Sequence, residues 1–262
     1  MSATVRPGHP DADPGTDLGA GPGSGPPEHH DPGIDARTVG ATLVGLALLL
    51  GAYQVIAGHL IPPLATFAGL FAASGAVVLL RPRRWSLLVA GTVALVYLAG
   101  GVEFFVANLA HPESPVSFLA EAFLLIGLVA VLVTVAAALR RAVGHRRPVA
   151  VGAGSLAVLA VVVSIVAGLA VDSEAPGDDD VAVVVERSSF PGVVEVPAGT
   201  TVLWVDNQDP FHHTLVIDDT DVRAVLPAST GVRVPVDLPA GDHRYWCDVP
   251  GHEAMEGTLR VR

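Results

Sequence analysis

The only cysteine of the chain, Cys247, lies in a short segment together with His252 and Met255. A thiolate, an imidazole and a thioether within nine residues are a set of soft ligands that suits copper. A mononuclear electron-transfer copper site uses two His nitrogens and one Cys sulfur in a trigonal plane, with a weak axial Met. Three of these four ligands are therefore present here, and the second histidine has to come from a distant part of the chain.

That histidine is offered by the segment 209–217, where His212 and His213 stand at the start of a strand-like run. Alternation along a strand places His213 on one face with Leu215 and Ile217, and places His212 on the other face. A ligand has to point into the end of the sandwich with the apolar side chains. We therefore favour His213 over His212 as the second nitrogen ligand.

The elements that position these residues begin near residue 181, where short β-rich segments are separated by Gly, Pro and Asp. Pro-Ala-Gly breaks at 197–199 and 239–241 are typical of turns between strands. We expect seven strands, at 181–187, 192–196, 200–206, 213–218, 231–238, 241–247 and 257–262. Seven short antiparallel strands of this kind fit a Greek-key sandwich.

The residues of this C-terminal region resemble those of the cupredoxins, the small blue-copper domains of the plastocyanin and azurin type. The likeness rests on the motifs at 196–200, Asn207, 213–214, 245–247, 250–252 and 255–261. The resemblance implies one type 1 copper, with Cys247, His213 and His252 as strong ligands and Met255 as the axial ligand. The spacing is Cys-x4-His-x2-Met, with an azurin-like first gap and a shorter second gap.

Other interpretations of Cys247 are a buried inert thiol, a catalytic Cys-His pair and a structural zinc site. The first leaves the nearby His and Met without a role, and the second has no residues for an oxyanion site. A dinuclear copper centre would need a second cysteine, which the chain lacks.

The residues before this domain are strongly apolar, and hydrophobic residues make up 51% of the whole chain. Stretches of about 17–25 apolar residues are long enough to cross a bilayer. We expect five transmembrane helices, at 38–60, 63–80, 85–109, 116–139 and 148–171. The predicted fold class is thus an all-α membrane region fused to an all-β Greek-key sandwich.

Arginine sets the expected orientation, because excess Arg marks cytoplasmic loops. Arginines cluster at 81–84 and 140–147, whereas the loop after the third expected span has none and carries Glu113. The N-terminus is then cytoplasmic, and everything after residue 171 lies outside the cell membrane. Residues 1–37, rich in Gly, Pro, Asp and His, are predicted to be a disordered cytoplasmic tail. Residues 172–180 are predicted to be a linker, and 181–262 the copper domain.

Charge is distributed unevenly along the chain, whose net charge is −11. Residues 172–262 contain 17 acidic and six basic residues, so this region alone also carries −11. An acidic outer domain would steer toward a basic docking surface on a partner protein. The sign of the charge argues against nucleic-acid binding.

Four of the polar residues inside the expected spans are candidates for function, since such groups are costly in a membrane and tend to be functional. They are Gln54, His59, Glu103 and Glu121, all expected in the outer half of the membrane. One interpretation is simple placement at the lipid headgroups. The other is a cluster that binds a metal ion or a quinol and exchanges with the copper domain.

These observations predict a membrane-anchored copper protein that carries single electrons on the outer face of the membrane. It would be a carrier and not an enzyme, with a redox protein and the membrane lipid as its partners. We expect His252, on an exposed loop, to be the electron port and outward-facing Trp246 to offer a second route. The alternative is copper binding, delivery or sensing without redox turnover.

Overall fold

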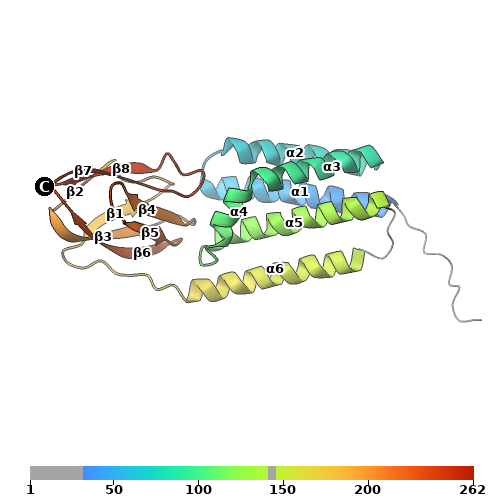
Figure 1. The fold of residues 1–262 in the computed structure, drawn as a ribbon. Helices are drawn as coiled ribbons and strands as arrows, with labels where there is room; N and C mark the ends of the chain where they lie inside the picture. Colours follow the sequence, from blue (N-terminus) through green and yellow to red (C-terminus); the bar gives the residue numbers. More distant parts are fainter. Residues whose placement is uncertain (1–31, 141–145) are drawn as a thin grey trace, which may run out of the picture.

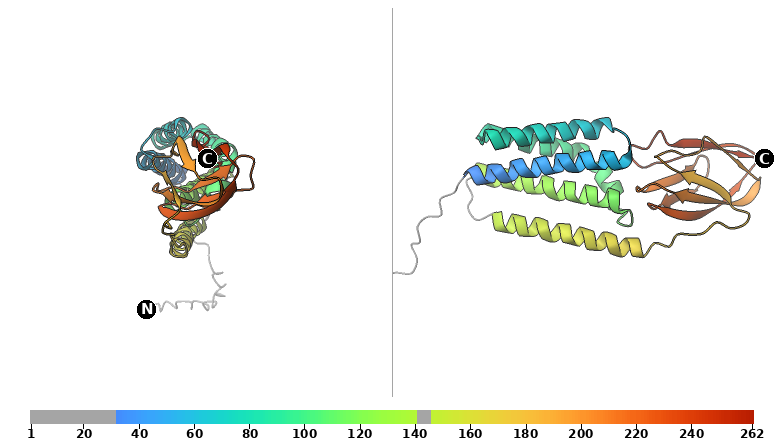
Figure 2. Two further views of the ribbon diagram at one scale, coloured as in Figure 1. Left: turned by 90° about the vertical axis from the view of Figure 1, so that its left-hand side faces the viewer. Right: turned by 180° about the vertical axis from the view of Figure 1, so that it is seen from behind.

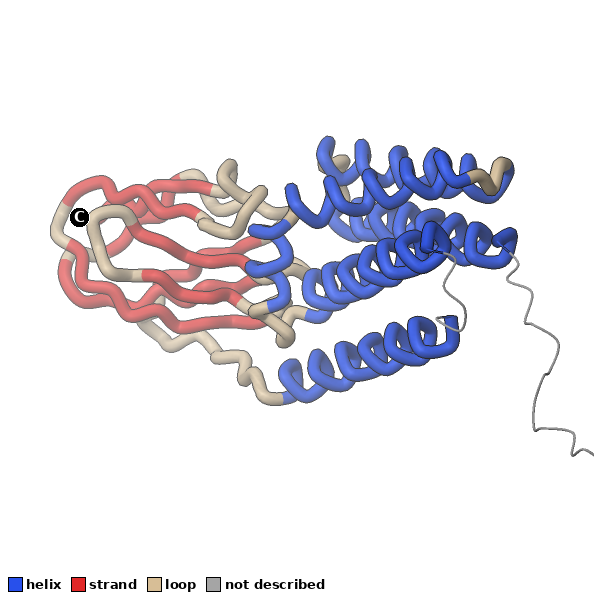
Figure 3. Tube along the Cα trace, turned by 45° about the vertical axis from the view of Figure 1, so that its right-hand side comes forward, coloured by secondary structure: helices blue, strands red, loops and turns tan. Residues whose placement is uncertain are grey.

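The protein, represented by a computed structural model, is described over residues 32–140 and 146–262. These residues form six helices followed by eight strands, in two separate halves (Figures 1 and 3). The helices are α1 (Pro32–Ala57), α2 (Pro62–Leu80), α3 (Arg84–Gly100), α4 (Val102–Leu109), α5 (Pro115–Arg140) and α6 (Arg146–Leu169). The predicted boundaries of the apolar stretches are confirmed to within a few residues, except that α1 begins at Pro32, inside the predicted tail. Residues 1–31 of that tail lie outside the described residues.

Four of these helices, α1, α2, α5 and α6, are long and apolar enough to cross a membrane. The third expected span is different, because α3 and α4 meet at a bend of 62°. If this bent pair counts as one span, the number of spans is five. The expectation of a continuous helix over residues 85–109 was therefore wrong.

The bend lies at Gly100 and Gly101, a pair of glycines in an otherwise apolar run. A Cβ on Gly101 would lie 2.9 Å from the carbonyl oxygen of Tyr97, closer than a real Cβ comes. The absence of a side chain lets α4 turn off the end of α3, and Gly–Gly pairs are poor helix formers. Glu103, in the first turn of α4, is redirected by this bend.

The helices run side by side and the sandwich lies at one end of them (Figures 1 and 2). The α1–α2 turn, α4 and the loop before α5 are at the end that faces the sandwich, whereas the Arg81–Arg84 region is at the opposite end (Figure 1). The chain enters the sandwich from the near end of α6. Most of the apolar side chains of α6 are exposed.

The eight strands pack as two sheets around one hydrophobic core. One sheet has the order β1-β3-β6 and the other has the order β2-β8-β7-β4-β5. Their bounds are β1 (Val181–Val185), β2 (Val193–Val196), β3 (Gly199–Asn207), β4 (His213–Ile217), β5 (Arg223–Leu226), β6 (Thr230–Leu238), β7 (Gly241–Trp246) and β8 (Glu256–Val261). Alternating burial, as along β6, sends every second side chain into this core.

The predicted sandwich is confirmed, with two differences. β5 was not predicted, because its four residues include Arg223 and only Leu226 is fully buried. The pairs β1–β3 and β2–β8 are parallel, not antiparallel. Residues 186–192 carry the chain from the first sheet to the second. β1 therefore lies beside β3 in one sheet and β2 lies beside β8 in the other, and the two strands of each pair run in the same direction.

Residues 172–180 are bound along the sandwich and do not form a free linker. The backbone N–H of Glu174 donates to Gly231 O at 2.9 Å, and the indole of Trp204 donates to Glu174 O at 2.8 Å. Arg233 forms an ion pair with Asp180, 2.7 Å between Nε and Oδ2. These contacts shorten the free connection between α6 and the sandwich.

The sandwich also contacts the near ends of the helices directly. Tyr53 of α1 and Phe211 have ring centroids 5.1 Å apart, and the rings of His111 and His212 are 4.5 Å apart. The backbone N–H of Ala228 donates to the hydroxyl of Ser114 at 3.1 Å. The loops at this end of the sandwich are therefore seated on the helical part.

Candidate metal centre

The candidate ligands come from two neighbouring strands and one loop at the end of the sandwich that faces the helices. His213 opens β4, and Cys247 directly follows β7. These strands are antiparallel neighbours in which Val216 is paired with Trp246, so the start of β4 meets the end of β7. The loop 248–255 between β7 and β8 adds His252.

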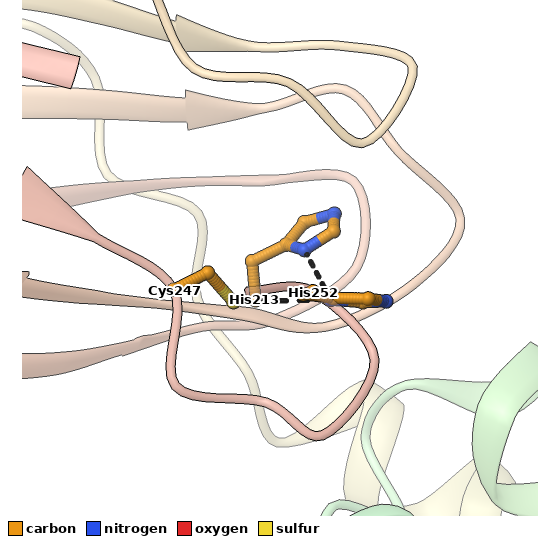
Figure 4. A group of neighbouring side chains, drawn as sticks. All are labelled: His213, Cys247 and His252. Atoms are coloured by element: carbon orange, nitrogen blue, oxygen red, sulfur yellow. Dashed lines mark hydrogen bonds between the residues drawn. The ribbon is translucent and has the colours of Figure 1, made fainter. Parts of the chain in front are cut away.

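Three of these side chains converge on one point (Figure 4). His213 Nδ1 lies 3.1 Å from His252 Nδ1, and Cys247 Sγ lies 3.8 Å from His252 Nδ1. One ligand atom from each residue lies within 4.8 Å of the other two. Metal–nitrogen bonds of about 2.0 Å and metal–sulfur bonds of about 2.3 Å allow one ion to bridge donors at such separations.

His213 is held in the orientation that a ligand needs. Its side chain is fully buried, and its Nε2 lies 3.0 Å from Asp209 Oδ2. With the Nε2 proton donated to this carboxylate, Nδ1 keeps its lone pair for a metal. Asp209 is itself fixed, because the backbone N–H groups of Arg187 and Ser188 both donate to it at 2.7 Å.

Cys247 is surrounded by hydrogen-bond donors. The backbone N–H of Thr214 donates to Sγ at 3.4 Å, and the Thr214 hydroxyl lies 3.5 Å from the same atom. Burial raises the pKa of the Cys247 thiol, but interactions with His213, His252 and Thr214 outweigh burial and lower the pKa to about 5. The site therefore favours the thiolate, the form of cysteine that binds metal.

The loop that carries His252 is a compact set of turns. His252 N–H donates to Val249 O at 2.9 Å and Met255 N–H donates to His252 O at 2.8 Å. The Cys247 N–H donates to Met255 O at 3.0 Å, which closes the loop. Gly251 has a φ of +87°, which favours glycine, and so allows the backbone to turn here. Met255, the last residue of this loop, is also buried and 3% exposed.

The donor set fits copper, since two imidazole nitrogens and one thiolate match the strong ligands of a blue-copper site. Met255 supplies a thioether within the same loop. The structure brings together His213, Cys247 and His252, and it places His212 elsewhere. The ring of His212 packs on His111 at the junction with the helices, on the face of β4 opposite to His213.

Trp246 is half-buried on the side of β7 away from the metal centre. Its Nε1 donates to Asp218 Oδ1 at 2.8 Å, and the guanidinium of Arg244 lies 5.4 Å from the ring centroid. The indole is therefore fixed next to Cys247 in the chain.

The four polar residues of the helices are not gathered in one cluster. Glu121 and His59 both line a cavity between the helices and the sandwich. Gln54 and Glu103 do not line it: Gln54 accepts a hydrogen bond from Ile61 N at 3.1 Å and so closes the α1–α2 turn, and Glu103 is exposed on α4. The four residues were expected at a similar depth in the membrane, but their side chains point in different directions from the helices and turns that carry them.

Two residues of the site were missed by the sequence analysis, Asp209 and Thr214. The signal for Thr214 was its place directly after His213 on β4, which puts its backbone N–H beside the next strand. Asp209 could have been noticed as a carboxylate four residues before the candidate ligand. The loop between β3 and β4 that folds it back onto His213 has no marker in the sequence.

A family profile for the cupredoxin-like domain matches residues 157–261. The C-terminal domain is cupredoxin-like. The match begins within α6, so its first residues lie in a helix, and the cupredoxin-like sandwich itself starts at Val181. The chain has no significant match among curated proteins.

Solved structures similar to this chain include an amicyanin from Paracoccus versutus, at 18% identity and a TM-score of 0.28, covering 34% of this chain and 86% of that one. A rusticyanin from Thiobacillus ferrooxidans is 20% identical with a TM-score of 0.25, over 34% of this chain and 86% of that one. A copper-containing nitrite reductase from Thermus scotoductus is 26% identical with a TM-score of 0.26, over 36% of this chain and 24% of that one.

Proposed function

We propose that the protein is a membrane-anchored electron carrier with one type 1 copper on the outer face of the membrane. The observation that carries this proposal is the convergence of His213 Nδ1, His252 Nδ1 and Cys247 Sγ at the buried end of a cupredoxin-like sandwich. These three groups would hold the copper, and Met255 would be its axial ligand. Copper in such a site supplies a one-electron Cu(I)/Cu(II) couple.

The surrounding residues support rapid electron transfer, because they fix the ligands before any metal binds. Asp209 holds the ring of His213, and Thr214 holds the sulfur of Cys247. Ligands that are fixed by neighbouring hydrogen bonds rearrange little when the charge of the metal changes. Ligands fixed in this way suit an electron carrier, in which the metal changes its charge without binding a substrate.

The outer location is supported by the position of basic residues. The segment 81–84 between α2 and α3, which contains three arginines, lies at the end of the helices away from the sandwich (Figure 1), and Arg-rich ends of spans are cytoplasmic. The acidic charge of residues 172–262 favours a redox partner with a basic docking surface. We propose His252 as the main electron port and half-buried Trp246 as a second route.

The test is the visible spectrum of the whole protein after addition of Cu(II). We expect an intense thiolate-to-copper absorption band, with one copper per chain by metal analysis. Cys247→Ser removes the thiolate and should abolish the band, whereas Met255→Leu should keep it because the axial bond is weak. Absence of the band in the unaltered protein would overturn the assignment.

The same sample separates electron transfer from copper delivery. A carrier should keep its copper in the presence of a chelator and exchange electrons rapidly between Cu(I) and Cu(II) forms. Ready loss of copper to the chelator would favour delivery or sensing instead.

A further inference from the structure

A cavity of about 450 Å³ lies between the near ends of the helices and the copper-site end of the sandwich. Cavities of about 300–1,000 Å³ are the usual size for small-molecule sites. This one is bordered by α1, α2, the α3–α4 bend and α5, and by the loop that carries His252. It therefore joins the helical part to the metal centre.

The walls of the cavity suit a flat ring. Aromatic side chains line it from both halves of the molecule, namely Tyr53, Phe67, Tyr97, Phe104 and Phe211. Tyr97 and Phe67 are in edge-to-face contact, with centroids 4.8 Å apart, so these walls are packed in place. Aromatic walls of this kind bind another aromatic ring by offset or edge-to-face contact.

One carboxylate, Glu121, breaks the apolar lining. Its Oε1 accepts a hydrogen bond from Asn108 Nδ2 at 3.5 Å, and its Oε2 is buried without a hydrogen-bond partner among the described residues. A buried carboxylate oxygen without a donor is costly, and native proteins nearly always supply one. A ligand with a hydroxyl group would supply this donor.

The cavity is open to the outside of the molecule and also reaches the metal centre. Leu60 in the α1–α2 turn and Phe104 in α4 line it and are 71% and 40% exposed. His252 lines it on the side of the sandwich, together with His59 from the α1–α2 turn. A second hollow of about 460 Å³, lined by His59, His252 and Met255, adjoins it.

We propose that this cavity binds a lipid-soluble hydroquinone, which donates electrons to the copper site through His252. This inference rests on the proposed electron-carrier function and names its donor. One hydroxyl group would donate to Glu121, and the ring would lie among the aromatic walls with its other hydroxyl toward His252 and His59. The alkyl chain would leave past Leu60 and Phe104 into the membrane.

The reaction balances with a one-electron site. Oxidation of the hydroquinone to the quinone breaks two O–H bonds and releases two protons and two electrons. The electrons leave singly, so each hydroquinone reduces two Cu(II) in succession, and a soluble one-electron acceptor protein reoxidises the site after each step. Glu121 accepts one proton, and water in the hollow beside His59 accepts the other.

Binding is tested first on the copper-free whole protein in phospholipid nanodiscs, with decylubiquinone as the probe and empty nanodiscs as the reference. Calorimetry should show saturable binding of one probe per chain. Gly100→Leu should weaken it by at least tenfold, because Gly100 lines the cavity and has open space for a side chain. Gly69→Leu, also with open space but on α2 away from the cavity, should bind normally.

Glu121→Gln provides a second test that leaves the shape of the cavity intact. Loss of a hydrogen bond to a charged acceptor should weaken binding of decylubiquinol, which carries the donating hydroxyl groups, by about tenfold. Glu103→Gln, an exposed glutamate on α4 that does not line the cavity, is the matched control and should have no effect. No saturable binding, equal binding by Gly100→Leu, or equal displacement by n-decane, which has only the chain, would overturn the proposal.

The electron step is then tested on copper-loaded protein without oxygen. Decylubiquinol should bleach the blue band with a stoichiometry of two proteins per hydroquinone, and Gly100→Leu should slow this at least tenfold. If the blue band never forms, the electron-carrier function fails and the donor role with it. If the band forms but the copper-free protein does not bind the probe, only the hydroquinone site is overturned.

Discussion

The metal centre has two sides that are built differently. On the strand side, His213 and Cys247 are fully buried and each is held by a neighbouring polar group, Asp209 or Thr214. On the loop side, His252 is half-buried and lines two hollows, and its backbone is held by the turns of residues 248–255. The strand side therefore fixes the geometry of the site, and the loop side gives access to it.

The contrast predicts that a missing imidazole can be replaced from solution on one side only. His252→Gly and His213→Gly should both lose the blue band of the copper-loaded protein. Added imidazole should restore the band in His252→Gly, because the space of that ring adjoins the hollows, but not in His213→Gly, because that ring is enclosed. Absorption titration with imidazole measures this.

His243→Gly serves as the control, since His243 donates to Pro239 O away from the site and should keep its band throughout. Rescue of both ligand variants, or of neither, would remove the proposed difference between the two sides.

The strand side should also respond to loss of a group that touches no metal. Asp209→Asn keeps the size of the side chain but replaces the charged acceptor of the hydrogen bond from His213 Nε2 with a neutral amide. Loss of such a partner typically lowers metal affinity by about 10- to 100-fold. Competition for Cu(II) with a chelator of known affinity gives the value, with Asp237→Asn on the exposed face of β6 as the control.

An Asp209→Asn protein with unchanged copper affinity would mean that the backbone alone positions His213. The strand and loop sides would then differ in burial only.

The sequence predicts the parts of the metal centre that depend on regular strand structure better than the parts that depend on loops. Strand alternation selected His213 over His212, because the period of two leaves only one face for a ligand. The spacing of Cys247, His252 and Met255 placed three candidates in one loop. Asp209 was missed because it lies in a loop whose path depends on the hydrogen bonds of Asn207, not on a local pattern.

In the helical half, hydropathy predicted where the long apolar helices lie in the chain but not which way their polar side chains face. Glu103 and Glu121 were expected at the same depth, yet only Glu121 faces the cavity. The bend at Gly101 turns α4 by 62° and sends Glu103 to the surface. The contact of this helical end with the sandwich depends on pairs such as Tyr53–Phe211, which join distant parts of the chain. Such contacts cannot be found from the periodicity of either half.

Thr214 links the strand side to the first residue of the loop, and its loss should be moderate. Its hydroxyl donates to Asp248 Oδ1 at 2.7 Å and accepts from Asp248 N at 2.9 Å. Thr214→Val leaves both groups without this partner and should destabilise the sandwich by about 1–3 kcal/mol. The sandwich has a core of its own, so urea unfolding of residues 172–262 measures the change.

Thr200→Val, on an exposed position of β3, is the matched control and should be neutral. If Thr214→Val were equally neutral, water would replace the hydroxyl, and the link between the strand and the loop would carry little free energy.

The smallest effect is expected at the outermost contact of the loop, the ion pair of Arg223 and Asp248. Arg223 Nε and Nη2 donate to the two carboxylate oxygens at 2.8 and 3.1 Å, but the side chain of Arg223 is 54% exposed. Exposed pairs of this kind contribute about 0–1 kcal/mol and are screened by salt. Arg223→Ala should therefore lower the unfolding free energy of residues 172–262 by less than Thr214→Val does, and the difference from the unaltered segment should shrink as salt is added.

Arg262→Ala, whose 71% exposed side chain pairs with Glu195 at 3.4 Å far from the loop, is the control for a general effect of charge. A loss at Arg223 as large as that at Thr214, unchanged by salt, would show that the loop side is held as firmly as the strand side, and the contrast between them would then rest on access to His252 alone.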